Sequence, residues 1–214
     1  MTAFESAVNL EKFEECRDER VEREKIGKVL EAGRNSPSPQ RTQTVEFVVV
    51  ESQEDRETLS EITGDERLEK APTSIILVSD LERIERRTED SDMRTVCMAE
   101  AASAAQNMRL VAQENGLASI WLSGFDEVRI AERFDIPEGK TPLAIVSLAY
   151  TDEPVPQSQK FGLNEICFYD RYGNKIDEIF EDFEWKGVQE EAEIYSDKAK
   201  GLLDRVRRKI RKVL

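Results

Sequence analysis

Histidine is absent from all 214 residues of this sequence. Its absence excludes Ser-His-Asp and Cys-His catalysis, and it excludes any metal site built on imidazole ligands. The three cysteines, Cys16, Cys97 and Cys167, are far apart and form no CxxC pair. We therefore expect reduced thiols, no metal site and, from such cysteine usage, a cytoplasmic protein.

Long apolar runs and basic charge are also scarce. No run is long enough to span a membrane, and residues 1–16 are acidic without the apolar core of a signal peptide. The 31 lysines and arginines are outnumbered by 45 aspartates and glutamates, which leaves a formal net charge of −14. Nucleic acids and anionic membranes bind basic surfaces, so the acidic balance argues against both as partners.

The pattern of apolar residues predicts helices alternating with a few strands. We expect helices over residues 5–16, 21–34, 54–63, 93–115 and 126–134, and strands over 45–50, 72–79 and 141–150, with 118–122 extended. Residues 81–92 are predicted to form a charged connection. This order favours a layered α+β or α/β domain.

Two helical segments have distinctive compositions. The segment 93–115 is rich in alanine, which allows another helix to approach closely, so we expect a core or dimer helix. Residues 174–214 form a charged amphipathic extension that is acidic first and basic at its end. The basic end is either a contact for nucleic acid or membrane, or, as we favour, part of a helix packed on the protein's own dimer. The predicted domains are therefore 1–173 and 174–214.

Five segments, in this order, resemble the nitroreductase family. They are DERVEREKIGKVLEA (18–32), SPSPQRTQTVEFVVV (36–50), ENGLASIWLSGFD (114–126), IPEGKTPLAIVSLAYTDEPVP (136–156) and KFGLNEICFYDRYG (160–173). The resemblance implies a homodimeric α+β fold, a three-layer α/β/α sandwich with a central mixed or antiparallel sheet. It also implies FMN at the dimer interface and an oxidoreductase that uses NAD(P)H to reduce a small aromatic, quinone or related acceptor.

The same resemblance assigns cofactor contacts. The family's first basic motif, which grips the FMN phosphate, falls on residues 10–16, where Glu11 and Glu14 replace two arginines and Lys12 remains. The expected cofactor-binding residues are Lys12, Pro37, Ser38, Arg41, Gln43, Leu122, Ser123, Gly124 and Lys160. No catalytic side chain is assigned, because the flavin itself carries out hydride transfer.

The acidic replacements leave an alternative open. Carboxylates that face a phosphate repel it, so Glu11 and Glu14 are also compatible with a dimer that has lost FMN and serves as a binding, scaffold or regulatory protein. A third possibility is an unrelated acidic α/β protein.

Overall fold

The computed structural model describes residues 3–38, 43–85, 93–155 and 161–174. The chain divides into two compact units, Met1–Gln157 and Ser158–Leu214. In the second unit, the described residues form the short helix α8 (Leu163–Ile166) and a ring contact in which the centroids of Phe168 and Tyr172 are 4.5 Å apart. Apart from Asn174, the predicted extension 174–214 lies outside the described residues.

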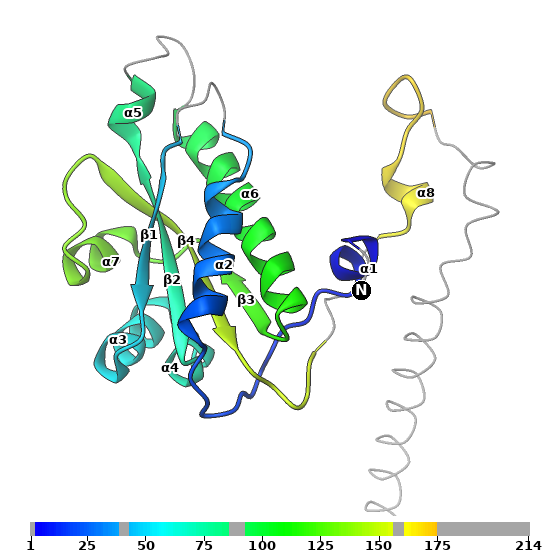
Figure 1. Cartoon of the computed structure of the whole chain (residues 1–214). Coiled ribbons are helices and arrows are strands. Elements are labelled where there is room, and N and C mark those ends of the chain that lie inside the picture. The colour runs from blue at the N-terminus through cyan, green and yellow to red at the C-terminus, as the bar shows by residue number, and fades with distance from the viewer. Residues whose placement is uncertain (1–2, 39–42, 86–92, 156–160, 175–214) are drawn as a thin grey trace, which may run out of the picture. The chain divides into compact units, whose positions relative to one another are not determined.

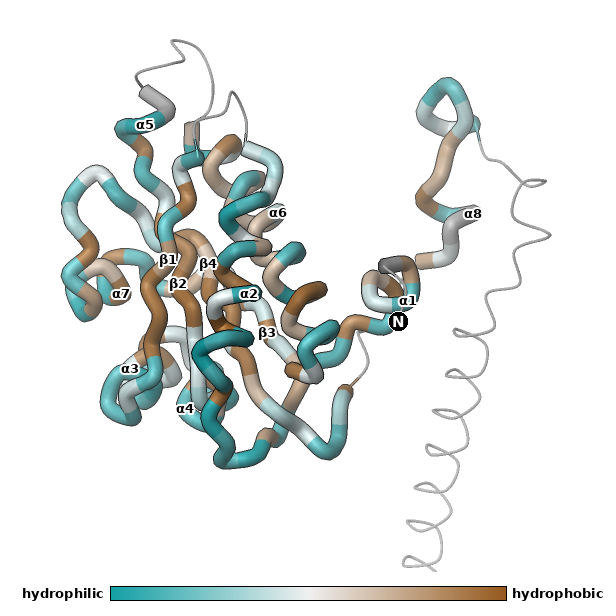
Figure 2. The backbone as a smooth tube through the Cα atoms, in the orientation of Figure 1, coloured by the Kyte–Doolittle hydropathy of each residue, from teal (hydrophilic) through white to brown (hydrophobic). Residues whose placement is uncertain are grey.

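The first unit is built on a four-stranded antiparallel sheet with the strand order β1-β2-β4-β3 (Figure 1). Its strands are β1 (Val45–Val50), β2 (Thr73–Asp80), β3 (Ala118–Leu122) and β4 (Lys140–Ala149). The central strands β2 and β4 are buried on both faces, as a continuous apolar run predicts. Figure 2 shows much of these strands, and of β1, in the brown of hydrophobic residues.

Helices α2 (Arg23–Arg34) and α6 (Met93–Glu114) cover one face of the sheet (Figure 1). Small residues bring the two helices together. A Cβ atom on Gly33 would lie 2.9 Å from the Met108 side chain and 2.9 Å from the ring of Phe47. The alanine-rich helix is therefore a core helix, as predicted.

The other face is covered by α3 (Gln53–Thr63), α4 (Arg67–Lys70) and α7 (Glu127–Arg133). These helices bury Leu59, Leu68 and Ile130 against the sheet. Helix α3 begins at Ser52, whose hydroxyl accepts a hydrogen bond from the Asp55 amide, and ends at Gly64 in the left-handed conformation. The unit is thus a three-layer α/β/α sandwich, which confirms the predicted fold.

The prediction of a helix over 5–16 is wrong for its second half. Helix α1 (Ala3–Val8) stops early, and the chain then runs extended, with a β-bridge between Lys12 and Val155. Leu10 and Phe13 are fully buried there. Their three-residue spacing fits a helix equally well, so the pattern alone did not reveal the tertiary contact that extends the chain.

Two further observations complete the fold. The predicted connection 81–92 begins with a short helix, α5 (Leu81–Glu85), and residues 86–92 lie outside the described part of the chain. Within the described residues, every helix is too short or too polar to cross a membrane.

Candidate flavin site

Residues 9–16, the N-terminal segment, lie against the turn between α3 and α4. The Glu14 carboxylate accepts a hydrogen bond from the Arg67 guanidinium at 3.1 Å, and that of Glu15 accepts one from the Lys70 ammonium at 2.7 Å. The Cys16 thiol donates to the Lys70 carbonyl at 3.3 Å, and its burial raises the pKa of the thiol. Glu14 and Glu15, which fall where the family has its basic motif, are therefore ion-paired within the chain.

An open cavity of about 520 Å³ lies at this contact. Its walls come from the N-terminal segment, the turn between α3 and α4, and the end of β3; they are formed by Glu14, Glu15, Thr63, Gly64, Asp65, Glu66, Arg67, Lys70 and Leu122. Four carboxylates and two cationic groups give the walls a formal excess of two negative charges.

The cationic groups of this cavity already form ion pairs within the chain. Arg67 donates to both oxygens of Asp65, at 2.8 and 2.6 Å, as well as to Glu14. This hydrogen-bonded pair lowers the pKa of Asp65 and raises the pKa of Arg67. A phosphate dianion entering the cavity would meet paired cations and surplus carboxylates, so the cavity does not fit the phosphate of FMN.

Positive charge without a carboxylate partner lies instead on the α6 side of the N-terminal segment. Lys12 is half-buried, and among the described residues its ammonium makes no ion pair. Its neighbour Phe13 packs in the core on the α3 side of the sheet. Lys12 does not line the cavity, and the backbone of Glu11 beside it is hydrogen-bonded to Gln113 of α6 and to Ser119 of β3.

Arg109 of α6 is the second cation on that side. Only 8% of its surface is exposed, and its Nε lies 3.3 Å from the Ser119 hydroxyl. Burial lowers the pKa of the guanidinium, with no nearby carboxylate among the described residues to oppose the shift. Lys12 and Arg109 therefore supply the anion-binding groups that the cavity lacks, and on this side the residues fit a flavin phosphate.

The loop before β1 carries a second group of predicted contacts. The Gln43 amide donates to the Ser38 hydroxyl at 2.6 Å, and Arg83 donates to the Gln43 carbonyl at 2.8 Å. Gln43 has a φ of +48°, which is unusual for a residue other than glycine. Two of the expected flavin contacts, Ser38 and Gln43, are thus brought together, with Pro37 immediately before them.

A buried carboxylate of α6 anchors this loop. Glu100, only 2% exposed, accepts hydrogen bonds from the Thr44 hydroxyl at 2.7 Å and from the Thr44 amide at 3.1 Å. The Thr44 hydroxyl also lies 3.0 Å from that of Ser79. Glu100 therefore satisfies the first backbone donor after the loop, and it fixes where the loop joins the sheet.

The third group, Leu122, Ser123 and Gly124, follows the other edge of the sheet. Leu122 ends β3 and contributes to the cavity wall. Gly124 has a φ of +79°, and a Cβ there would meet open space. The residue thus permits a backbone conformation and a close approach that a side chain would oppose.

The two groups of predicted contacts do not converge within one chain. Ser38 and Gln43 precede the edge strand β1, whereas Leu122 ends the opposite edge strand β3. Three interstrand spacings separate the two edges, about 14 Å at the usual distance between strands. One chain therefore presents two half-sites on opposite edges of its sheet.

The remaining predicted residues are only partly placed. Arg41 and Lys160 lie outside the described residues, and Lys12 does not share the cavity with Leu122. The sequence interpretation missed Glu100 and Arg109. A signal existed, because both fall on the buried stripe of α6 among alanines and methionine, where a charged side chain is unusual.

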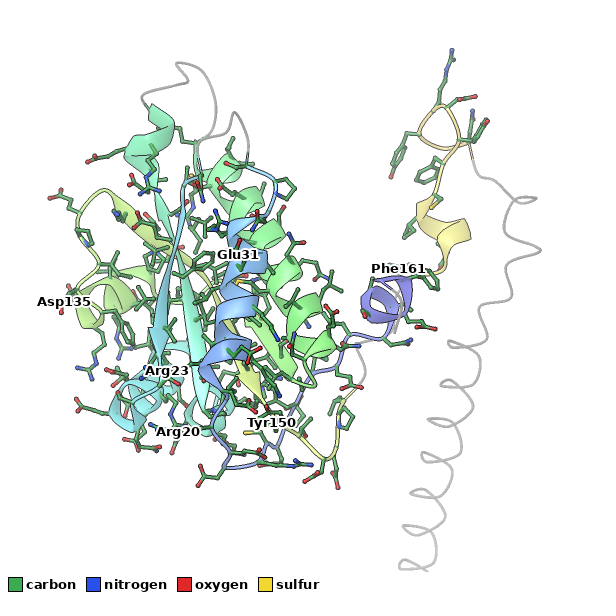
Figure 3. The ribbon with its side chains drawn as sticks, viewed as in Figure 1. Arg20, Arg23, Glu31, Asp135, Tyr150 and Phe161 are labelled. Carbon is green, nitrogen blue, oxygen red and sulfur yellow. The ribbon has the colours of Figure 1, made fainter. Side chains whose placement is uncertain are left out.

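A polar cluster joins the end of β4 to the start of α2. The Tyr150 hydroxyl donates to Glu22 and accepts from Lys25, each at 2.5 Å, and Figure 3 shows Tyr150 beside the first turn of α2. The hydrogen bond from Tyr150 lowers the pKa of Glu22, and the same hydroxyl raises the pKa of Lys25. All polar groups of the cluster are satisfied, so we assign it a structural role.

Comparison with known proteins agrees with the fold. The model of the nitroreductase family matches residues 16–66 and 63–150. The chain is similar to a nitroreductase family protein of Clostridium difficile, with 25% identity over 80% of this chain and 99% of that chain and a TM-score of 0.69. It is similar to nitroreductase A of Vibrio parahaemolyticus, with 17% identity over 82% and 79% of the two chains and a TM-score of 0.74. A search of curated proteins finds no match.

Proposed function

Because the chain belongs to the nitroreductase family of flavin oxidoreductases, we propose that it is a homodimeric, FMN-dependent NAD(P)H oxidoreductase that reduces a small aromatic, quinone or related acceptor. The bound flavin supplies the hydride chemistry, and the protein holds and orients it. Leu122, Ser123 and Gly124 of one copy hold the ring from one side, with Lys12 toward the phosphate; the family resemblance adds Lys160, which lies outside the described residues. Pro37, Ser38 and Gln43 of a second copy approach from the other side, and the family resemblance adds Arg41, which lies outside the described residues.

The observation that carries this proposal is the position of the half-sites on opposite edges of the sheet. In a two-fold symmetric dimer, the same two patches meet twice, so each dimer gains two complete sites. A monomer cannot bring the β1-edge loop to the end of its own β3, since β2 and β4 lie between them. The anchoring of the loop by Glu100 keeps one half-site in place before assembly.

The purified full-length chain tests the proposal directly. We expect a yellow protein with flavin absorbance, a dimer by light scattering, and NAD(P)H oxidation that depends on an added quinone or nitroaromatic compound. A colourless protein that takes up no FMN at high micromolar concentration would contradict the function. A monomer would contradict the shared site.

Complementation tests the shared site more sharply. Gly124→Val alters one half-site and Ser38→Glu alters the other, so each homodimer is expected to bind little flavin. A heterodimer of the two variants contains one unaltered site if the half-sites come from different copies. We expect co-expression to restore flavin to about one site per dimer. No restoration, in dimers shown to be mixed, would place both half-sites within one copy.

One observation favours a second function. The pairs Glu14–Arg67 and Glu15–Lys70 occupy the cations of the cavity from within the chain. A member that had lost FMN would retain such pairs because they fasten the N-terminal segment, and it would act as a binding, scaffold or regulatory dimer. The absence of flavin uptake together with an intact dimer would support this alternative.

A further inference from the structure

Arg109 is a charged side chain in a place where charge is costly. The residue is only 8% exposed on the core helix α6, and among the described residues its guanidinium contacts the hydroxyl of Ser119. A buried charge is normally paired with an opposite charge, because desolvation otherwise costs several kilocalories per mole. The neighbouring positions of α6 are filled by Ala105, Met108 and Ala112, all buried and apolar. An arginine among them requires an anion that the described residues do not supply.

The backbone of Glu11 passes directly beside this guanidinium. Arg109 and Gln113 lie one turn apart on α6 and so share a face of the helix. The Gln113 side chain accepts a hydrogen bond from the Glu11 amide at 2.8 Å. The Ser119 amide, next to the Arg109 contact, donates to the Glu11 carbonyl at 3.2 Å. The segment that carries Lys12 is therefore held between the C-terminal part of α6 and the start of β3.

Lys12 follows one residue later, about 3.8 Å along the backbone. Its bridge to Val155 fixes its backbone, and its side chain is absent from the cavity wall. Arg109 and Lys12 bring two cationic groups to this segment outside the cavity, whereas the walls of the neighbouring cavity carry two surplus negative charges. An anionic group is therefore directed to the α6 side.

We propose that Arg109, together with Lys12, binds the phosphate group of the flavin nucleotide. The inference rests on the proposed function and identifies the phosphate contact that replaces the arginines lost at Glu11 and Glu14. A guanidinium suits this task, since its planar fork donates two hydrogen bonds to phosphate oxygens. Ser119 orients the guanidinium through Nε and leaves the outer nitrogens for the ligand. Leu122, at the ring end, lies three residues farther along β3, about 10 Å at the usual rise per residue.

Comparing FMN with riboflavin separates the phosphate from the ring. Affinities are measured by quenching of flavin fluorescence on the full chain. We expect wild-type protein to bind FMN more tightly than riboflavin. The Arg109→Met variant is expected to lose about tenfold to hundredfold in FMN affinity, as for a charge-assisted hydrogen bond, with riboflavin affinity unchanged. Arg133→Met, which removes the same charge at the surface pair with Glu54 and Asp55, is the matched control and should bind both flavins as wild type does.

Stability without ligand provides a second readout. If the partner of Arg109 is a ligand anion, Arg109→Met removes an uncompensated buried charge from the flavin-free protein. The Tm of the flavin-free variant is then expected to equal or exceed that of the flavin-free wild type. A fall of several degrees would show that an acidic group of the chain itself pairs with Arg109, and it would overturn the proposal.

The outcomes distinguish this inference from the proposed function. The phosphate site would be overturned if Arg109→Met lost affinity equally for FMN and riboflavin, or if the wild-type protein bound both flavins equally. Either result would leave the proposed flavin function intact. Binding of neither flavin by wild-type protein would overturn both.

Discussion

The Glu100 carboxylate in the core helix lies 2.7 Å from the Thr44 hydroxyl and 3.1 Å from the Thr44 amide, and it fastens the loop before β1 to α6. Removing the acceptor leaves two buried donors without partners. We expect Glu100→Ala to lower the free energy of unfolding by about 2–4 kcal/mol, measured by chemical denaturation.

Glu100→Gln is the matched control for this contact. Its amide oxygen still accepts one of the two hydrogen bonds, whereas its NH₂ group accepts none, so we expect an intermediate loss. An effect of Glu100→Ala below about 0.5 kcal/mol, the range of ordinary surface substitutions, would mean that Glu100 does not anchor the loop.

The two glycines of α2 provide a paired test of the contact between α2 and α6. A Cβ on Gly33 would meet Met108 and Phe47 at 2.9 Å, whereas a Cβ on Gly27 would meet nothing within 4 Å. We expect Gly33→Ala to destabilise the protein by about 1–2 kcal/mol through overpacking. Gly27→Ala should stabilise it by about 0.5–1 kcal/mol, since alanine favours the helix. Thermal unfolding measures both, and equal effects at the two positions would refute the close approach.

Asp65 gives a prediction about pH. Its hydrogen bonds with Arg67 lower its pKa below the ordinary 3.8. A carboxyl with a lowered folded pKa contributes stability above its unfolded pKa, and the contribution is lost as the pH falls through the folded value. The Asp65 side chain is 15% exposed and lines an open cavity where solvent screens the ion pair, so we expect Asp65→Asn to cost about 1 kcal/mol at pH 7.

The gap in Tm between wild type and Asp65→Asn should therefore narrow as the pH falls below 3.8, the unfolded value. A gap that stays constant from pH 7 to the acid limit of the folded state would show that Arg67 does not stabilise the charged form.

Glu14 tests whether cavity charge limits FMN binding. Glu14→Gln removes one of the two surplus negative charges of the cavity walls and releases one hydrogen bond of Arg67. We expect the Kd for FMN to fall about threefold to tenfold, as for a partly screened charge near the ligand, and the Kd for riboflavin to change little. The double variant Glu11→Arg with Glu14→Arg should strengthen FMN binding further.

Glu57→Gln, on the exposed side of α3, makes the same change in net charge away from the cavity and is the control. If both variants improve FMN binding equally, the effect belongs to the overall charge of the protein. If neither does, the alignment that places Glu11 and Glu14 at the phosphate motif is wrong.

Strands and long helices were predictable because their signals are local. Residues 75–78 form an apolar run that a fully buried strand requires, and the structure has β2 there. The pair Asn115-Gly116 ends α6, and Gly116 takes a φ of +75°. Each of these features depends on the residues themselves and on nearby neighbours in sequence, so the chain alone suffices to identify them.

The features that escaped prediction depend on distant contacts. Leu10 and Phe13 are spaced as on a helix, but the bridge from Lys12 to Val155 joins segments more than 140 residues apart and makes the chain extended. Glu100 and Arg109 fall on the apolar stripe of α6, but their contacts with Thr44 and Ser119 join segments that are separate in sequence. Sequence spacing also gave no means to see that Ser38 and Leu122 lie on opposite edges of one sheet.

The side chains of the N-terminal segment have two separate roles. Leu10 and Phe13 fill the core, whereas Lys12, Glu14 and Glu15 face ligand space or the turn at Arg67 and Lys70. Because different side chains have these two roles, substitution of Lys12, Glu14 or Glu15 can alter what the protein binds. The apolar side chains of Leu10 and Phe13, which anchor the segment in the core, are then unchanged. Substitutions in this segment can therefore change or remove ligand binding among related proteins while the fold is retained.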